Sequence, residues 1–224
     1  PQALERGGRE RLGAAEARLS SWKVVRRSID ARRGPVRLVF TVDVSLTGDE
    51  AIPAVDAQPP PERTLLRVDP GLEPCPGRPL VVGAGPAGLY AALLLAGHGY
   101  RPLLIDRGGG TDERIAALLR FRETRAPDPE RNALYGLGGA GTFSDGKLAT
   151  SLGDGWIPEI LRVLHECGAP AEILVDAKPH VGTDLLPGIV TRLVARIVAA
   201  GGEVRTSVRA DDFVPLGVIR LGGG

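Results

Sequence analysis

Short apolar runs and longer amphipathic stretches alternate through the second part of the chain. Four segments have the length of parallel strands, at 80–83, 102–106, 172–176 and 203–208, and the first three contain short apolar runs. Apolar residues at helical spacing predict helices near 87–96 and at 112–122, 158–167 and 184–200. Strands that alternate with helices in this way predict an α/β fold around a parallel sheet.

Two details of this pattern extend the prediction. In the helix at 112–122, Ile115, Leu118 and Leu119 share one face, which we expect to pack inward. After the last parallel strand, residues 210–214 and 217–221 predict a β-hairpin. A doubly wound sheet usually has about five or six strands. We therefore expect the sequence to be the amino-terminal part of a longer α/β protein.

The first 78 residues follow a different pattern. Residues 9–19 predict a helix, whereas 22–29 and 36–46 predict strands, the second by its alternation of apolar and polar positions. We expect a small α+β domain at residues 1–46. Seven prolines lie between residues 47 and 78, and they disfavour a helix there. This segment is predicted to be a linker that leads into a domain at 79–224.

Composition narrows the classes of function. The 224 residues carry 28 Lys and Arg against 27 Asp and Glu, so the net charge of +1 argues against a nucleic-acid-binding protein. The basic stretch at 26–33 is interpreted as a solvated face or a contact between domains. No apolar run approaches the length of about 18 residues that spans a membrane, and no signal peptide is recognised, so we expect a cytoplasmic protein without membrane contact.

The metal-ligating and redox residues are few. Cys75 and Cys167 are the only cysteines, and they form neither a C-x-x-C pair nor a zinc-binding pattern. We therefore expect no metal site and no disulfide reductase. Of the three histidines, His180 is the one we keep as a candidate for a substrate site, because it lies in the segment Lys178-Pro-His-Val-Gly-Thr-Asp184.

Three glycines at G-x-G-x-x-G spacing separate the strand at 80–83 from the helix that follows. Gly83 can turn sharply at positive φ, Gly85 lets a pyrophosphate approach the backbone, and Gly88 lets the helix pack close to the sheet. Pro86 suits the first helical turn because it has no N–H to leave unpaired. The N–H groups of that turn, beginning at Ala87, and the helix dipole favour an anion. The pattern predicts a dinucleotide site.

Asp106 completes this pattern at the end of the next apolar run. It follows Gly88 by 18 residues, which is the order and distance expected of the acidic residue in a dinucleotide-binding fold. Its carboxylate is predicted to accept hydrogen bonds from the ribose hydroxyls of the adenosine half and to repel a 2′-phosphate. The glycines and the acid by themselves leave FAD and NAD both open.

The segment GAGPAGLYAALLLAGHGYRPLLIDRG resembles the opening of the FAD-binding domain in glutathione-reductase-type flavoproteins, including an acid followed by arginine, here Asp106 and Arg107. Three further strings resemble a group of poorly characterised bacterial FAD-dependent dehydrogenases. They are SWKVVRRSIDARRGPVRLVFTVDV, GLGGAGTFSDGKL and KPHVGTD. The resemblance implies FAD rather than NAD, an incomplete Rossmann-like FAD-binding domain after the small α+β domain, and a missing carboxy-terminal half. It also implies that backbone groups of Val208 contact the adenine.

A second glycine cluster at 136–141 matches neither a second dinucleotide site nor a P-loop, because no buried strand precedes it and Leu148 stands where Ser or Thr would bind magnesium. We interpret it as a loop whose N–H groups face the other half of the cofactor. The resemblance places Gly138, Gly139, Ala140 and Gly141 along the pyrophosphate or the isoalloxazine. Ser144 and Lys147 are then the nearest groups able to donate to a flavin carbonyl or a substrate anion.

These residues predict an FAD-dependent oxidoreductase whose substrate, catalytic residues and oligomeric state are not indicated by the sequence. The absence of a second glycine fingerprint suggests that NAD(P)H would bind only transiently, as an electron donor. Two alternatives remain open: a dinucleotide-binding module or fragment without turnover, and an oxidoreductase that uses NAD(P) alone. We also expect weak or no retention of FAD by this chain alone.

Overall fold

The computed structural model describes residues 18–48, 77–132, 155–214 and 218–223, together with positions 4, 6, 7, 10, 11, 72, 75, 136, 137 and 148. Most of the predicted linker and the predicted cofactor-facing residues Gly138, Gly139, Ala140, Gly141, Ser144 and Lys147 lie outside the described residues. The described helices include none that is both long and apolar enough to cross a membrane.

The amino-terminal part forms a two-stranded antiparallel ribbon. Strands β1 (Leu19–Asp30) and β2 (Arg37–Leu46) pair from Leu19 opposite Leu46 to Asp30 opposite Arg37, so both predicted strands are present. The helix predicted at 9–19 is wrong at its end, because Leu19 already belongs to β1; residues 12–17 lie outside the described residues. Apolar side chains near the β1–β2 turn stay exposed, including Ile29 and Val36, each 70% exposed.

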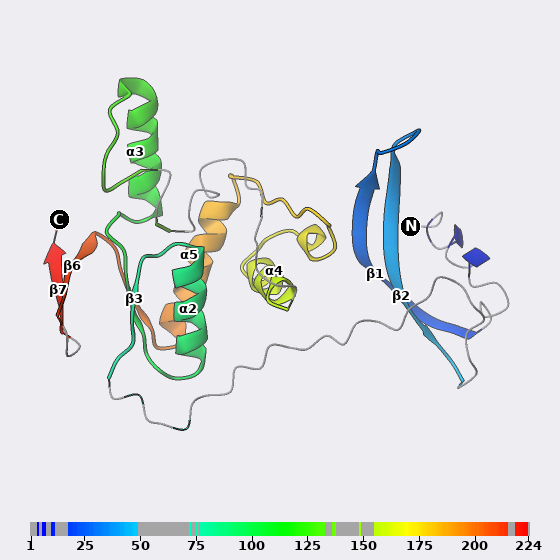
Figure 1. The fold of residues 1–224 in the computed structure, drawn as a ribbon, viewed down its shortest axis with the longest axis horizontal. Coiled ribbons are helices and arrows are strands. Elements are labelled where there is room, and N and C mark those ends of the chain that lie inside the picture. The colour runs from blue at the N-terminus through cyan, green and yellow to red at the C-terminus, as the bar shows by residue number, and fades with distance from the viewer. Residues whose placement is uncertain are drawn as a thin grey trace.

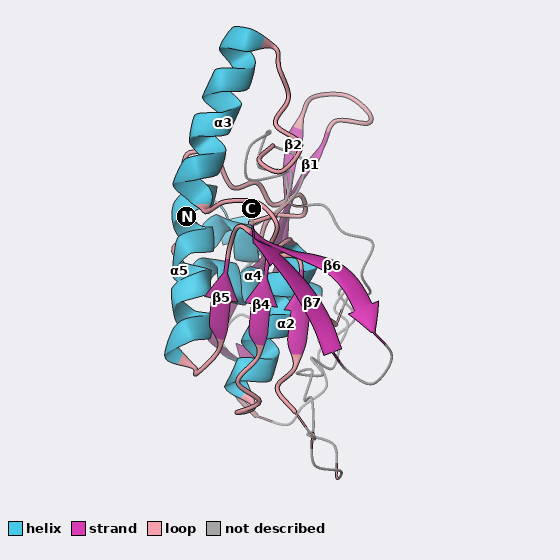
Figure 2. Cartoon of the chain, turned by 90° about the vertical axis from the view of Figure 1, so that its left-hand side faces the viewer, coloured by secondary structure: helices cyan, strands magenta, loops and turns pink. Residues whose placement is uncertain are grey.

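A parallel sheet of three short strands organises the second part of the chain. Strands β3 (Leu80–Val82), β4 (Leu103–Ile105) and β5 (Glu203–Arg205) lie in the order β3–β4–β5, at positions that the apolar runs predicted. Figure 2 shows β4 and β5 side by side, with the β6–β7 hairpin next to them. This order corresponds to half of a doubly wound sheet, so the α/β, Rossmann-like fold is confirmed.

Two helices cover this sheet and supply most of its core. Helices α2 (Pro86–Gly97) and α5 (Leu186–Ala199) lie side by side in Figure 1, and both contact the strands. Their inward positions recur at helical spacing, as the sequence predicted. The buried apolar side chains of the two helices are Leu89, Ala92, Ala96, Leu186, Ile189, Val190, Leu193 and Ile197.

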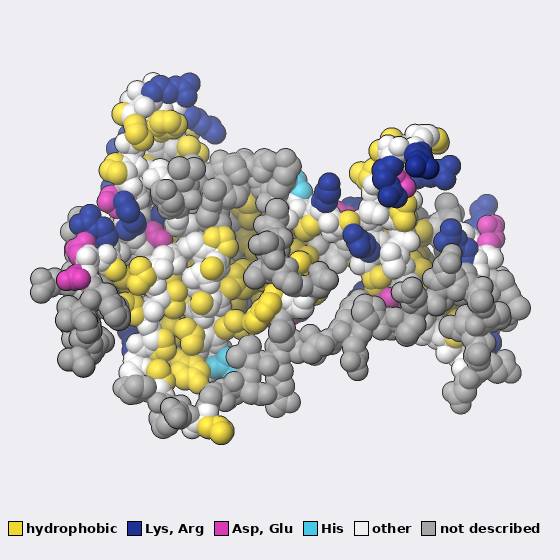
Figure 3. Space-filling view, viewed as in Figure 1, with side chains coloured by type: hydrophobic (Ala, Val, Ile, Leu, Met, Phe, Trp, Pro, Cys, Tyr) yellow, Lys and Arg dark blue, Asp and Glu magenta, His cyan; other side chains and the backbone are white. Residues whose placement is uncertain are grey.

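The remaining helices and the hairpin follow the prediction in position. Helix α3 (Thr111–Thr124), helix α4 (Ile157–Glu166) and the hairpin of β6 (Val208–Val214) with β7 (Val218–Gly223) occur where the sequence placed them. The predicted inward face of α3 is wrong, because Ile115 and Leu119 are 36% and 52% exposed while Arg114 and Ala117 are buried. Figure 3 shows basic side chains at the outer end of α3, which projects into solvent.

The strand predicted at 172–176 is also wrong. Residues Ala171–Leu174 form a 3₁₀ turn, η3, and the chain then pairs with β1 rather than with the parallel sheet. The N–H of Arg27 donates to the Val175 carbonyl at 2.7 Å, and its guanidinium donates to both Asp176 carboxylate oxygens at 2.6 and 2.9 Å. Arg27 belongs to the basic stretch at 26–33, so the interpretation of that stretch as a contact is confirmed for this residue.

Candidate dinucleotide-binding site

The turn between β3 and α2 has the backbone geometry that the glycine spacing predicted. Gly83 adopts φ = +98°, and its N–H donates to the Ile105 carbonyl of β4 at 2.7 Å. A β-carbon on Gly88 would overlap with the Gly83 carbonyl oxygen, so this glycine is needed where α2 packs against the turn. A β-carbon on Gly85 would meet no atom of the described residues within 4 Å. Among the described residues, none therefore occupies the space beside Gly85 where a ligand would lie.

The first turn of α2 suits an anion. Gly85 is the N-cap of the helix and Pro86 is its first residue, while the first N–H bond of the helix runs from Leu89 to the Gly85 carbonyl at 3.0 Å. The N–H groups of Ala87 and Gly88 precede that bond, so they have no acceptor within the helix. The first turn carries no acidic side chain. These features fit the pyrophosphate of a dinucleotide, which needs close backbone approach and N–H donors.

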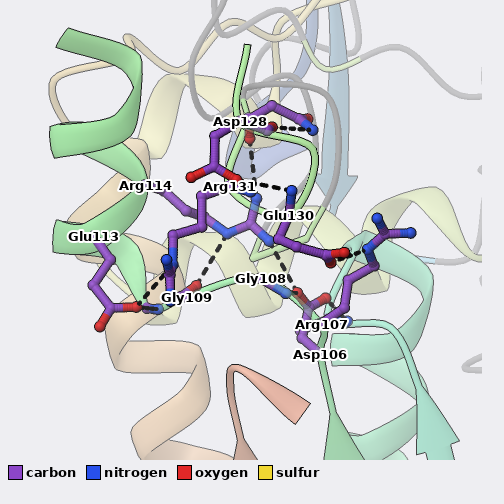
Figure 4. Close-up of polar contacts among 12 residues, drawn as sticks. Asp106, Arg107, Gly108, Gly109, Glu113, Arg114, Asp128, Glu130 and Arg131 are labelled. Atoms are coloured by element: carbon purple, nitrogen blue, oxygen red, sulfur yellow. Dashed lines mark hydrogen bonds and ion pairs between the residues drawn. The ribbon is translucent and has the colours of Figure 1, made fainter. Parts of the chain in front are cut away.

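Asp106 lies at the carboxyl end of β4, and its side chain is only 4% exposed. One carboxylate oxygen, Oδ2, accepts from the N–H of Ala84 at 2.7 Å, and the other, Oδ1, accepts from the N–H of Gly108 at 2.8 Å. The predicted bonds from Asp106 to ribose hydroxyls stay a prediction. What the structure adds is that the same carboxylate joins the glycine turn to the loop after β4, and Figure 4 shows Asp106 beside Gly108 of that loop.

The partner of Asp106 is Arg114, which the sequence analysis missed. Its Nη2 lies 2.9 Å from Asp106 Oδ1, and its side chain is only 1% exposed. Nε and Nη1 donate to the carbonyls of Gly109 and Asn132, each at 3.1 Å. A signal was present in the sequence, since Gly108 leaves room for a large side chain beside Asp106 and Ala117 follows Arg114 on the same helix face.

Arg107 occupies the outer edge of this cluster. Its Nε donates to Glu130 Oε2 at 2.6 Å and its Nη2 to the Pro129 carbonyl at 3.1 Å, with the side chain about half exposed. Beside this pair, Asp128 accepts from the N–H groups of Arg131 and Glu130, and these bonds hold the pKa of the Asp128 carboxyl below its ordinary value. A contact of Arg107 with the cofactor stays a prediction.

One backbone group of Val208 already has a partner. Its N–H donates to the Asp106 carbonyl at 2.9 Å, because the chain crosses the end of β4 as it enters β6. That N–H is therefore not available to an adenine while the bond is present, and the contact of Val208 with the adenine stays a prediction. Nothing in the structure tests a contact through the Val208 carbonyl.

Only the beginning of the second glycine cluster is described. Gly136 adopts φ = +82°, and Leu137 is buried. A β-carbon on Gly136 would overlap with Arg114 and lie 2.8 Å from Asp106 Oδ1, so this part of the cluster packs directly over the ion pair. His180 is exposed, and its substrate role stays a prediction.

The chain is similar to a bacterial protein and to a protein of known structure. An uncharacterized protein of Clostridium beijerinckii is 37% identical over 206 residues, which cover 90% of this chain and 39% of that protein. The chain thus spans about two fifths of the length of that relative. The crystal structure of THI4 from Thermovibrio ammonificans aligns with 63% of this chain and 44% of its own, at 21% identity and a TM-score of 0.36.

Two family models match parts of the chain. Residues 1–45 match a family described as "Domain of unknown function (DUF8436)". Residues 81–111 match the NAD(P)-binding Rossmann-like domain. The second match includes the glycine turn, α2, β4 and Asp106. Together with the parallel sheet, it identifies this part of the chain as a Rossmann-like dinucleotide-binding module.

Proposed function

We propose that this protein is an FAD-dependent oxidoreductase that holds the pyrophosphate of FAD against the turn at 83–88. The observation that carries the proposal is the open space beside Gly85, next to the N–H groups of Ala87 and Gly88, at the carboxyl edge of a parallel sheet. Ligands of open α/β sheets bind at this edge. The choice of FAD over NAD rests on the resemblance of the glycine segment and of three further strings to bacterial FAD-dependent dehydrogenases.

The chain's own residues would bind and orient the cofactor, whereas FAD supplies the two-electron chemistry when bound. The turn at 83–88 would hold the pyrophosphate, with Arg107 at the adenosine end. In the proposal, Gly138–Gly141 approach the other half of the cofactor, and Ser144 and Lys147 donate to a flavin carbonyl or a substrate anion. NAD(P)H is proposed as a transient electron donor. The substrate class is left open because fold does not determine it.

Affinity must come from more than the helix terminus. A helix N-terminus stabilises an anion by about 0.3–2 kcal/mol, whereas a Kd below 1 μM requires more than about 8 kcal/mol. Contacts beyond the turn therefore supply most of the binding free energy. We therefore propose that this chain by itself binds FAD weakly.

The visible absorption spectrum of the longest native form of the protein tests the proposal, because this chain by itself is expected to retain FAD weakly or not at all. We expect the bands of oxidised flavin, and we expect NADH or NADPH to bleach them. A stably bound flavin that neither NADH nor NADPH bleaches would favour a binding module without turnover. A colourless protein that binds a nicotinamide cofactor tightly would favour an oxidoreductase that uses NAD(P) alone. A protein that binds no dinucleotide would refute the proposal.

A further inference from the structure

The ion pair of Asp106 and Arg114 is the most deeply buried charge pair among the residues that the structure describes. The two side chains are 4% and 1% exposed, and Arg114 Nη2 lies 2.9 Å from Asp106 Oδ1. Burial of two charges is costly unless both are paired and hydrogen-bonded. In the described residues no buried side-chain nitrogen or oxygen lacks a partner. Both charged side chains thus have their hydrogen bonds satisfied, and the candidate dinucleotide site lies beside the pair.

The pair joins segments that are distant along the chain. Through Asp106, it contacts the N–H of Ala84 in the glycine turn and the N–H of Gly108 in the loop after β4. Through Arg114, it contacts the carbonyls of Gly109 and Asn132. Figure 4 shows Asp106 at the end of β4, Gly108 and Gly109 in the loop that follows, and Arg114 of α3 reaching toward them. The glycine turn is therefore linked through Asp106 to a residue of α3.

The space around Arg114 is shaped for its guanidinium. A β-carbon on Gly108 or on Gly136 would overlap with the Arg114 guanidinium. Gly136 begins the second glycine cluster, which the proposed function assigns to the other half of the cofactor. The ion pair therefore lies between the first glycine turn and the start of the second cluster.

We infer that Asp106 and Arg114 form a brace that positions the glycine turn for the dinucleotide, and that Asp106 acts through the Ala84 N–H rather than by accepting from ribose. The inference rests on the proposed function, because it concerns the same site. Three donors already occupy the short carboxylate of Asp106, and its side chain is 4% exposed, which leaves little surface for a ligand hydroxyl. Arg114 is a positioning residue that never touches the dinucleotide.

The test compares ADP with 2′-deoxy-ADP, which differ only at the ribose hydroxyl that a carboxylate acceptor would recognise. Binding is measured by calorimetry on the full chain, alongside a titration with FAD. With a brace, the wild-type protein binds the two nucleotides within about threefold of each other, because no buried acceptor is left unpaired by the missing hydroxyl. Asp106→Asn and Arg114→Met each weaken both nucleotides by the same factor, about tenfold or more.

A double variant shows whether Asp106 and Arg114 act as one coupled brace or as two independent contacts. Because Asp106 and Arg114 act together, Asp106→Asn with Arg114→Met should bind ADP no more weakly than the worse single variant. Asp30→Asn is the matched control, since Asp30 accepts from the side chain and the N–H of Arg32 in the same manner but is located on the exposed β1. This control should leave ADP binding unchanged.

If Arg114→Met does not fold, Arg114→Lys takes its place in the test. This variant keeps the positive charge but loses the planar guanidinium that donates to the carbonyls of Gly109 and Asn132. Amide hydrogen exchange at Ala84 in the ligand-free protein then reports on the brace, and we expect it to become faster. Unchanged exchange at Ala84 together with unchanged ADP affinity would overturn the inference. So would a wild-type preference for ADP of tenfold or more that Asp106→Asn abolishes, with dinucleotide binding itself intact. Absence of any FAD or ADP binding by the wild-type protein would instead refute the proposed function.

Discussion

Replacement of Gly85 by valine should abolish dinucleotide binding while leaving the fold intact. Gly85 has φ = −73° and ψ = 179°, an extended conformation that any residue adopts, and an added β-carbon would meet no described atom within 4 Å. Loss of the favourable glycine N-cap is partly offset by a less flexible unfolded chain, so we expect a change in the free energy of unfolding of about 1 kcal/mol or less. A branched side chain would, however, occupy the space proposed for the pyrophosphate.

The expected loss of binding free energy can be worked out from the hydrogen bonds that the pyrophosphate would lose. Displacement of the pyrophosphate removes its bonds to the N–H groups of Ala87 and Gly88. Hydrogen bonds to a charged group contribute about 1.5–3 kcal/mol each, so the pair contributes about 3–6 kcal/mol. The Kd for FAD should therefore rise by at least about 100-fold. Quenching of flavin fluorescence during a titration of cofactor-free protein measures this change.

Gly110→Val is the matched control. Gly110 is the N-cap of α3 with φ = −63° and ψ = 177°, and an added β-carbon there also meets nothing within 4 Å. The control thus imposes the same side chain at the same kind of helix terminus, and we expect it to bind FAD like the wild-type protein. Wild-type affinity in Gly85→Val would refute the site. An equal loss in both variants would show that the helix caps, not the ligand space, cause the effect.

Three further outcomes are expected. Gly88→Ala places a methyl group on the Gly83 carbonyl oxygen, so it should lower the free energy of unfolding by about 1–3 kcal/mol, seen as a lower Tm; an unchanged Tm would contradict the packing. Tyr90→Phe leaves the Ile160 carbonyl without its 2.9 Å donor and should cost about 1 kcal/mol in urea denaturation. The pKa of the Asp128 carboxyl is lowered in the folded protein. The carboxylate of Asp128 therefore stabilises the fold fully above the ordinary carboxyl pKa of about 4, and this stabilisation is lost as the pH falls through the pKa of Asp128 in the folded state. Asp128→Asn should therefore show a shallower loss of stability in acid, whereas an identical acid limb would contradict this assignment.

The contact of the amino-terminal ribbon illustrates how far sequence patterns reach. Alternation predicted β1 and β2, and the basic stretch was interpreted as a solvated face or a contact. The partner of Arg27, however, lies 149 residues away, at Asp176. Because the segment at 175–177 uses its backbone groups to pair with β1, it does not join the parallel sheet. The apolar run at 172–176 has the same sequence pattern whether its segment joins the parallel sheet or pairs with β1.

The sequence by itself determined the features that depend on neighbouring residues. The three glycines at 83, 85 and 88 predicted a positive φ, an open approach and a close helix contact, and each is present in the turn. Helices α2, α4 and α5 were recognisable because their apolar spacing and their terminal prolines and glycines act within a few residues. These local signals were sufficient for an α/β, Rossmann-like fold.

Only the tertiary structure decided which groups meet at the site. The apolar side chains Ile115 and Leu119 suggested the wrong inward face for α3. The face that is buried carries Arg114, because its guanidinium pairs with the Asp106 carboxylate and because glycines leave space for it. Likewise, the Val208 N–H is taken by the Asp106 carbonyl as the chain crosses β4. Burial of a charge or a backbone donor is determined by partners from other elements, and helical or strand periodicity carries no information about those partners.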